Sequence, residues 1–130
     1  MIPPNSLVFV IDDDASVRKG LSRLLRSAGY KSEIFSSAAD FLARSPHPGP
    51  CCVIVDVRMP GLNGIEVAKE LTKCPPSPAV VICSVENAPE IVEAARQAGA
   101  LGYVFKSRIA EDLIVAVKSV AGGQSFVSPR

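Results

Sequence analysis

Short runs of mainly apolar residues alternate with amphipathic stretches along almost the whole chain. Most of these runs lack the polar alternation of a sheet with one solvated face, which is typical of parallel strands buried on both faces. Their length and composition predict strands rather than helices. The predicted strands cover Leu7–Ile11, Lys31–Phe35, Cys52–Asp56, Ala79–Cys83 and Gly102–Phe105.

The stretches between these runs carry apolar residues at the 3.6-residue spacing of helices. Asp14 can cap the start of the first helix, and Gly29 can close its end. Pro89 is acceptable in the first turn of a later one. The predicted helices cover Ala15–Ala28, a short stretch from a cap at Ser37 to about Ala43, Gly64–Lys73, Pro89–Ala98 and Ala110–Ala121.

The repeated strand–helix order in a chain of 130 residues predicts a single α/β domain. Right-handed crossovers give a flavodoxin-like (βα)5 fold, a doubly wound parallel sheet with strand order 2-1-3-4-5. The folded core is expected at about residues 6–121, and residues 122–130 are expected to begin a linker. Ligands of such sheets bind beyond the carboxyl ends of the strands, between strands 1 and 3.

Composition excludes several classes of protein. Apolar residues make up 48% of the chain, and 14 basic against 13 acidic residues leave a net charge of +1. This balance argues against nucleic-acid binding by bulk electrostatics. The apolar runs are too short to cross a bilayer, and the N-terminus lacks secretory features, so a cytoplasmic protein is expected.

The four cysteines do not predict a metal or redox site. Cys51, Cys52, Cys74 and Cys83 form no Cys-x-x-Cys pair, and His47 is the single histidine. A zinc site is therefore not expected, and the cysteines are interpreted as small apolar residues of a reduced protein.

Acidic residues follow two strands that the predicted order places side by side. Asp12 and Asp13 come after strand 1, and Asp56 ends strand 3. Three carboxylates in one crevice repel one another unless a cation neutralises them. Oxygen ligands suit a hard ion, so the cluster predicts a Mg²⁺ site.

Two further polar residues follow strands 4 and 5. Ser84 ends one apolar run, and Lys106 follows the other. A carboxylate nucleophile, a divalent metal, a hydroxyl and a lysine are the groups that phosphoryl transfer to an aspartate requires. Mg²⁺, Ser84 and Lys106 would each hold one oxygen of the phosphoryl group.

These pieces, in this order and spacing, resemble the receiver domains of bacterial two-component response regulators. The early part of the chain is most similar to the FixJ branch, and the later part to the NarL/LuxR branch. The resemblance covers Val8 to about Pro129. It rests on Ile11-Asp12-Asp13-Asp14, on Asp56-Val57-Arg58-Met59-Pro60-Gly61-Leu62-Asn63-Gly64, on Ser84, and on Gly102-Tyr103-Val104-Phe105-Lys106.

The resemblance implies a role for each residue of the predicted metal site. Asp56 would be the phosphoacceptor, with Asp13 binding Mg²⁺ directly and Asp12 binding it through water. The backbone carbonyl of Arg58 would complete the protein ligands. Arg58 and Glu86 would flank the path of the water that removes the phosphoryl group, so both are hypothesised to modulate its lifetime.

The resemblance also implies a switch. Ser84 would move toward the phosphoryl group and Tyr103 would swing inward, which couples the site to the face made by helix 4, strand 5 and helix 5. One departure concerns the residue after Lys106, where most relatives carry proline and this chain carries Ser107. A trans bond is expected there, because a cis bond before a non-proline residue is costly.

The partners implied are a sensor histidine kinase as phosphodonor, a homodimer on phosphorylation, and DNA through a helix-turn-helix output domain outside this chain. The module would accept and lose phosphate without being a turnover enzyme.

Two alternatives stay open. The first is a pseudo-receiver that only binds other proteins. The second is a phosphatase of the haloacid dehalogenase type, because Asp12-Asp13-Asp14-Ala15-Ser16 is close to its Asp-x-Asp-x-Thr signature. The phosphatase alternative leaves Asp56 unexplained, and no Gly-Asp-type acidic motif follows Lys106.

Overall fold

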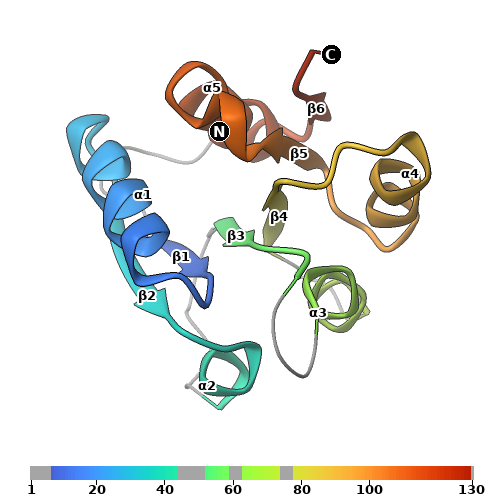
Figure 1. The fold of residues 1–130 in the computed structure, drawn as a ribbon, viewed down its shortest axis with the longest axis horizontal. Coiled ribbons are helices and arrows are strands. Elements are labelled where there is room, and N and C mark those ends of the chain that lie inside the picture. The colour runs from blue at the N-terminus through green and yellow to red at the C-terminus, as the bar shows by residue number, and fades with distance from the viewer. Residues whose placement is uncertain (1–6, 44–51, 59–62, 74–77, 130) are drawn as a thin grey trace.

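The computed structural model describes residues 7–43, 52–58, 63–73 and 78–129, and within them strands and helices alternate (Figure 1). The elements are β1 (Leu7–Ile11), α1 (Ala15–Ser27), β2 (Lys31–Phe35), α2 (Ala38–Leu42), β3 (Cys52–Val55), α3 (Gly64–Leu71), β4 (Ala79–Ser84), α4 (Pro89–Gln97), β5 (Gly102–Phe105), the 3₁₀ turn η1 (Lys106–Arg108), α5 (Ile109–Ala121) and β6 (Phe126–Val127).

The strands form one parallel sheet in the order β2-β1-β3-β4-β5-β6. The predicted order 2-1-3-4-5 is confirmed, and so are the bounds of the predicted elements to within about two residues, the usual uncertainty of element ends. The sixth strand was not predicted. It lies within residues 122–130, which sequence analysis assigned to the start of a linker.

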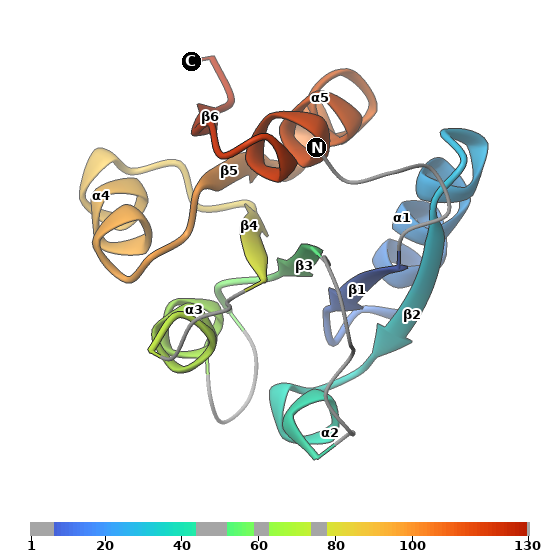
Figure 2. The same cartoon turned by 180° about the vertical axis from the view of Figure 1, so that it is seen from behind.

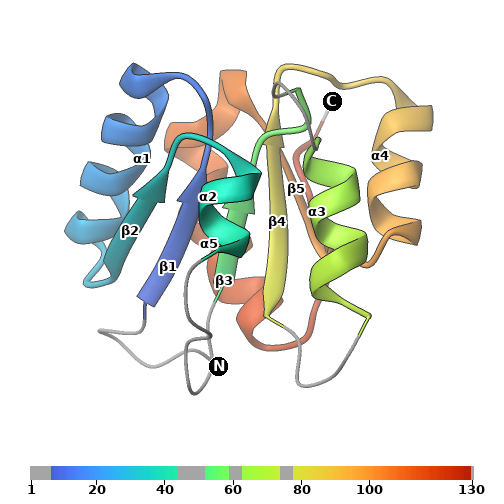
Figure 3. The ribbon, with the colours of Figure 1, turned by 90° about the horizontal axis from the view of Figure 1, so that it is seen from below.

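Helices cover both faces of the sheet (Figures 2 and 3). Alternate residues of β1 show why: Phe9 packs in one core with α2, α3 and α4, whereas Val10 packs in the other with α1 and α5. Because successive side chains of a strand point to opposite faces, a strand buried on both sides must be apolar throughout. This explains the continuous apolar runs in the sequence.

Local capping chemistry sets where the helices begin and end. Asp14 caps α1 as predicted, its carboxylate accepting hydrogen bonds from the backbone amides of Ser16 and Val17. Asn63 and Glu66 form a capping box at the start of α3, which sequence analysis did not predict. Gly29 ends α1 with φ 90°, where the Tyr30 amide bonds back to the Leu25 carbonyl, and Gly99 and Gly123 end α4 and α5 in the same way.

Several features named from sequence lie outside the described residues. They are His47, Cys51, Cys74 and the segment Met59–Leu62 of the resemblance. Among the described residues, no helix has the length and apolar character needed to span a membrane.

A glycine within α1 and another just after it make a matched test of backbone conformation. Gly20 lies in mid-helix and Gly29 follows the helix with positive φ, and an added Cβ meets no atom within 4 Å at either position. We therefore expect Gly20→Ala to raise the free energy of unfolding by about 0.5–1 kcal/mol. Gly29→Ala should lower it by about 1–2 kcal/mol, because the left-handed conformation is costly for alanine. Equilibrium urea unfolding measures both, and a shift of the same sign in the two variants would contradict this account.

Candidate functional site

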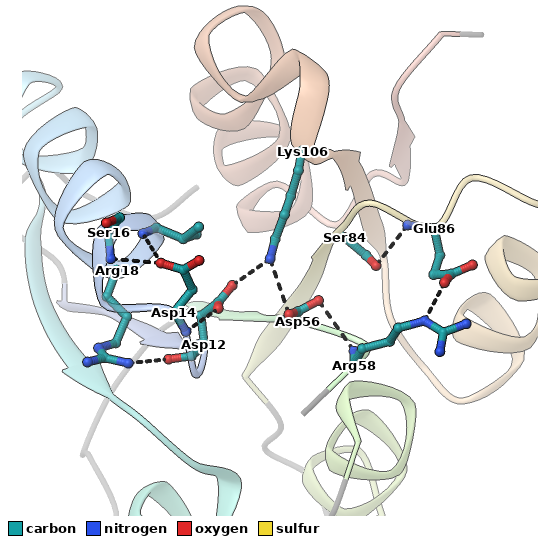
Figure 4. A network of polar contacts seen from close by, with 10 residues as sticks. Asp12, Asp14, Ser16, Arg18, Asp56, Arg58, Ser84, Glu86 and Lys106 are labelled. Atoms are coloured by element: carbon teal, nitrogen blue, oxygen red, sulfur yellow. Dashed lines mark hydrogen bonds and ion pairs between the residues drawn. The ribbon is translucent and has the colours of Figure 1, made fainter. Parts of the chain in front are cut away.

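The polar residues predicted from sequence meet at the carboxyl ends of the central strands (Figure 4). Strand register brings them together: Ile11 pairs with Val55, Val55 with Ile82, and Ser84 with Phe105. The residues that end or follow these strands therefore lie side by side. They are Asp12 and Asp13 after β1, Asp56 after β3, Ser84 at the end of β4 and Lys106 after β5.

The three carboxylates form a cluster that could hold a metal ion. One oxygen from each of Asp12, Asp13 and Asp56 lies within 4.8 Å of the others. Asp12 and Asp56 are only 1% and 6% exposed, whereas Asp13 is open to solvent. A donor set of carboxylate oxygens with one open side fits Mg²⁺, which keeps several waters and uses few protein ligands.

Lys106 spans the two buried carboxylates. Its Nζ lies 3.0 Å from Oδ2 of Asp12 and 3.1 Å from Oδ2 of Asp56. Burial lowers the pKa of Lys106, but its hydrogen bonds and charge interactions with the two aspartates outweigh burial and raise that pKa overall. The ammonium is therefore held charged. Three carboxylates facing one ammonium still leave an excess of negative charge, which favours a divalent cation.

The Asp56 carboxylate is held at both oxygens. Lys106 contacts Oδ2, and the backbone N–H of Arg58 donates to Oδ1 at 3.3 Å. Burial raises the pKa of Asp56 and the nearby charge of Asp12 adds to this. Lys106 and the Arg58 amide oppose the rise without cancelling it, so the pKa stays above its ordinary value. The carboxylate thus has a fixed orientation and a negative charge that its partners only partly compensate.

Asp12 is positioned by a network that sequence analysis did not find. Its Oδ1 accepts the Asp14 amide at 2.9 Å, and its backbone carbonyl accepts Nη1 of Arg18 at 2.7 Å. Arg18 lies one helical turn beyond the cap residue, so its spacing from Asp14 could have indicated a reach back to the loop. The network fixes the turn that presents both acidic residues.

Ser84 and Tyr103, the two predicted switch residues, are linked through Glu86. Ser84 is fully buried, and its Oγ accepts the Glu86 amide at 3.1 Å. Tyr103 is 2% exposed, and its hydroxyl donates to the Glu86 carbonyl at 2.7 Å. Burial raises the pKa of Tyr103, so the phenol stays protonated and remains a donor.

Arg58 and Glu86 form an ion pair with each other. The pair joins the segment after β3 to the segment after β4, beside Asp56 (Figure 4). Sequence analysis named both residues as flanking the site but did not pair them. Arg58 comes two residues after Asp56, and Glu86 comes two residues after Ser84. Because β3 and β4 are neighbours in the sheet, this equal spacing places the two side chains opposite each other.

Gly64, the first residue of α3, allows that helix to start against the Asp56 backbone. A Cβ at Gly64 would overlap the carbonyl oxygen of Asp56 and lie 2.8 Å from its carbonyl carbon. The Gly64 amide also donates to the Val57 carbonyl at 3.1 Å. The requirement for glycine at this position is therefore close approach rather than a positive φ.

The described cysteines take no part in the site. Cys52 and Cys83 are both buried and carry reduced thiols. Burial raises the pKa of Cys83 to about 12, so its thiol stays protonated. Within the parts of the chain that the structure describes, the three aspartates form the group that could hold a metal ion.

The model of the response regulator receiver domain family matches residues 8–118. The chain is 40% identical over 100 residues to the transcriptional regulatory protein FixJ of Bradyrhizobium diazoefficiens, which covers 76% of the chain and 48% of FixJ. It is 35% identical over 127 residues to the transcriptional regulatory protein UhpA of Salmonella typhimurium, covering 94% of the chain and 62% of UhpA. The chain therefore spans about half to three fifths of the length of these curated relatives.

Solved structures agree with this match. A two-component response regulator of the LuxR family from an Aurantimonas species superposes with a TM-score of 0.83 and 28% identity, covering 96% of the chain and 91% of that structure. The response regulator StyR superposes with a TM-score of 0.78 and 36% identity, covering 88% of the chain and 58% of StyR. A CheY-like receiver domain protein from Methanospirillum hungatei, 22% identical, shares the fold with a TM-score of 0.80.

The contact at Gly64 predicts a substitution that damages the site from its backbone. Gly64→Ala should lower the free energy of unfolding by about 1–3 kcal/mol, because the new methyl group overpacks against the Asp56 carbonyl. It should also weaken Mg²⁺ binding, since Asp56 must move to relieve the overlap. Urea unfolding and isothermal titration with Mg²⁺ measure the two effects. Gly20→Ala is the matched control, and equal Mg²⁺ affinity in the two variants would contradict the positioning role.

Proposed function

The chain belongs to the response regulator receiver domain family, and from this premise we propose that Asp56 accepts a phosphoryl group from a phosphohistidine of a sensor histidine kinase. The observation that carries the proposal is the contact of Lys106 Nζ with Asp56 Oδ2, at 3.1 Å, beside the acidic pair. Receiver domains are signalling modules. Asp56 is thus a phosphoacceptor that gains and loses phosphate without turning over a substrate.

The transfer itself is a substitution at phosphorus. A carboxylate oxygen of Asp56 forms the new O–P bond, the P–N bond to the donor imidazole breaks, and the imidazole nitrogen keeps the electron pair and takes a proton. Lys106 donates to one phosphoryl oxygen, and the hydroxyl of Ser84 donates to a second. Positioned donors of this kind supply most of the stabilisation in phosphoryl transfer.

The acidic cluster is the proposed Mg²⁺ site. Asp12, Asp13 and Asp56 would hold the ion together with the backbone carbonyl of Arg58. The bound ion supplies positive charge that offsets repulsion between the carboxylates and the incoming phosphoryl oxygens. Lys106 contributes the same kind of compensation through its contacts with two of the three aspartates.

The proposed switch uses the link between Ser84 and Tyr103. In this structure the Ser84 hydroxyl accepts a hydrogen bond from the Glu86 amide. To reach a phosphoryl oxygen, the hydroxyl must turn away from that amide. Glu86 also anchors the Tyr103 hydroxyl, so the two residues rearrange together. Because Tyr103 already lies buried on β5, next to α4 and α5, the rearrangement proposed here is a change in its hydrogen bond to Glu86 rather than an inward swing.

The output proposed for the whole protein is control of transcription in the cytoplasm. FixJ and UhpA are described as transcriptional regulatory proteins, and this chain matches only part of each. We propose that residues 122–130 lead from the receiver core toward a helix-turn-helix output domain that contacts DNA. Phosphorylation would favour a homodimer of the receiver.

Two alternative functions were open from the sequence. Family membership removes the support for a haloacid dehalogenase phosphatase, whose nucleophile would be Asp12. Asp12 is instead tied to Lys106 and to the Asp14 amide. A pseudo-receiver that binds partners without accepting phosphate is the second candidate, and the first experiment below separates it from the phosphoacceptor.

Incubation with Mg²⁺ and a small acyl phosphate should add one phosphoryl group, read as intact mass. Asp56→Asn should remove the adduct, because the amide is a poor nucleophile. Asp14→Asn is the matched control, since asparagine caps helices as well as aspartate and the charge change is the same. Removal of Mg²⁺ with a chelator should abolish labelling.

Retained labelling of Asp56→Asn would contradict the assignment of the acceptor. A wild-type chain that stays unlabelled, under conditions that label another receiver domain, would favour the pseudo-receiver.

The Arg58–Glu86 pair predicts an effect on phosphoryl lifetime. Glu86→Gln removes the ion pair beside Asp56 and opens the approach of water. An exposed pair is worth up to about 1 kcal/mol, so the lifetime should shorten by about two- to fivefold. The decay of the adduct mass after removal of the donor gives the lifetime. Glu90→Gln, an exposed residue in the first turn of α4, is the control. An unchanged lifetime in Glu86→Gln would refute the modulating role.

A further inference from the structure

The sixth strand adds a short edge to the sheet beside β5 (Figure 1). β6 is two residues long, with Phe126 opposite Gly102 and Val127 opposite Tyr103. Phe126 is partly buried against the core on the α1 and α5 side, whereas Val127 is 48% exposed. Little apolar surface therefore holds this strand, and hydrogen bonds must supply much of its attachment.

Ser128, just after β6, is the anchor of this attachment. It is 2% exposed, and its amide donates to the Tyr103 carbonyl at 2.9 Å. Its Oγ accepts the Phe105 amide at 3.1 Å. In a regular parallel ladder a backbone carbonyl would accept that amide. The side chain of Ser128 therefore closes the last rung between β5 and the C-terminal segment.

The same hydroxyl connects β5 to α5. Asp112, in the first turn of α5, is 6% exposed and accepts Nε of Arg108 at 2.8 Å. Arg108 and a hydrogen bond from Ser128 both lower the pKa of Asp112. Ser128 therefore accepts a hydrogen bond from Phe105 and lies close enough to Asp112 to stabilise that carboxylate. It stands between β5 and the first turn of α5.

Both attachment points on β5 are next to residues of the phosphorylation site. Phe105 immediately precedes Lys106, whose Nζ contacts Asp12 and Asp56. Tyr103, the other attachment point, is tied through its hydroxyl to Glu86. A movement at either end of the site therefore reaches Ser128 through β5 without passing through a loop.

We propose that β6 and Ser128 form a releasable strand, and that phosphorylation of Asp56 weakens its docking on β5. The inference rests on the proposed function. Phosphorylation draws Lys106, the residue after β5, from its two aspartates toward the phosphoryl group. It also draws Ser84 from Glu86, the residue that accepts the Tyr103 hydroxyl of β5. The last hydrogen bond between β5 and the C-terminal segment depends on the single hydroxyl of Ser128. A small movement of β5 is therefore enough to weaken it.

The coupling is reciprocal. If phosphorylation loosens the strand, a chain with a loosened strand must favour the phosphorylated state by the same factor. Ser128→Ala removes the hydroxyl that accepts the Phe105 amide but leaves the backbone of the segment intact. It should therefore lower the concentration of beryllofluoride, a phosphoryl mimic, that half-saturates the site.

Hydrogen exchange read by mass spectrometry tests the proposal on the full chain. With Mg²⁺ and an acyl phosphate, a peptide spanning residues 122–130 should exchange at least about fivefold faster than without the donor. The same peptide in Asp56→Asn should not respond to the donor. Intact mass of the same sample reports the adduct, and slow exchange in β3 shows that the domain stays folded.

Two serines give the matched variants. Ser128→Ala should exchange fast with and without the donor, and its half-saturating beryllofluoride concentration should fall. Ser125→Ala, at an exposed position three residues earlier, should behave as the wild type. An adduct with unchanged exchange of residues 122–130 would overturn the releasable strand and leave the phosphoacceptor standing. The absence of any adduct would overturn both.

Discussion

The burial of two carboxylates at the ends of neighbouring parallel strands is the constraint on which this structure depends. Asp12 and Asp56 are almost fully buried, and a buried carboxylate costs several kcal/mol unless it is paired. Lys106 pairs with both. Because the lysine follows β5 and the aspartates follow β1 and β3, the site forms only if all three strands are in register within one sheet. The charges of the site are therefore balanced only when the sheet has this strand order.

The two apolar cores hold the strands in this register. Each central strand is packed on both faces, so its carboxyl end has little freedom to shift. The groups around Asp56 add local precision. The Arg58 amide orients one oxygen, and the missing side chain of Gly64 lets α3 begin directly against the Asp56 carbonyl. The Lys106 ammonium and the Asp56 carboxylate are thus already in contact in this structure, as the proposed phosphoryl transfer requires of preorganised groups.

β5 connects the site to the edge of the sheet, because its residues contact both. Lys106 and Tyr103 connect it to the residues around Asp56, while Ser128 bonds to the same strand from the outside. An edge strand presents unpaired backbone groups, and natural proteins cover such edges. Here the cover is a short segment attached mainly by hydrogen bonds. A sheet edge of this kind fits the proposed release of the strand on phosphorylation.

The sequence by itself determined the fold class, the strand order among the first five strands and the positions of Asp12, Asp56, Ser84 and Lys106 at strand ends. Apolar periodicity and helix caps are local patterns, and the rules of parallel sheets convert them into a topology. The pairing of Arg58 with Glu86 and the β6 strand could not be found in this way. These contacts join residues far apart in the chain through side-chain reach and a single hydroxyl, and no local pattern encodes such distances. Only the packed sheet, by fixing where each strand ends, decided which of these groups would meet.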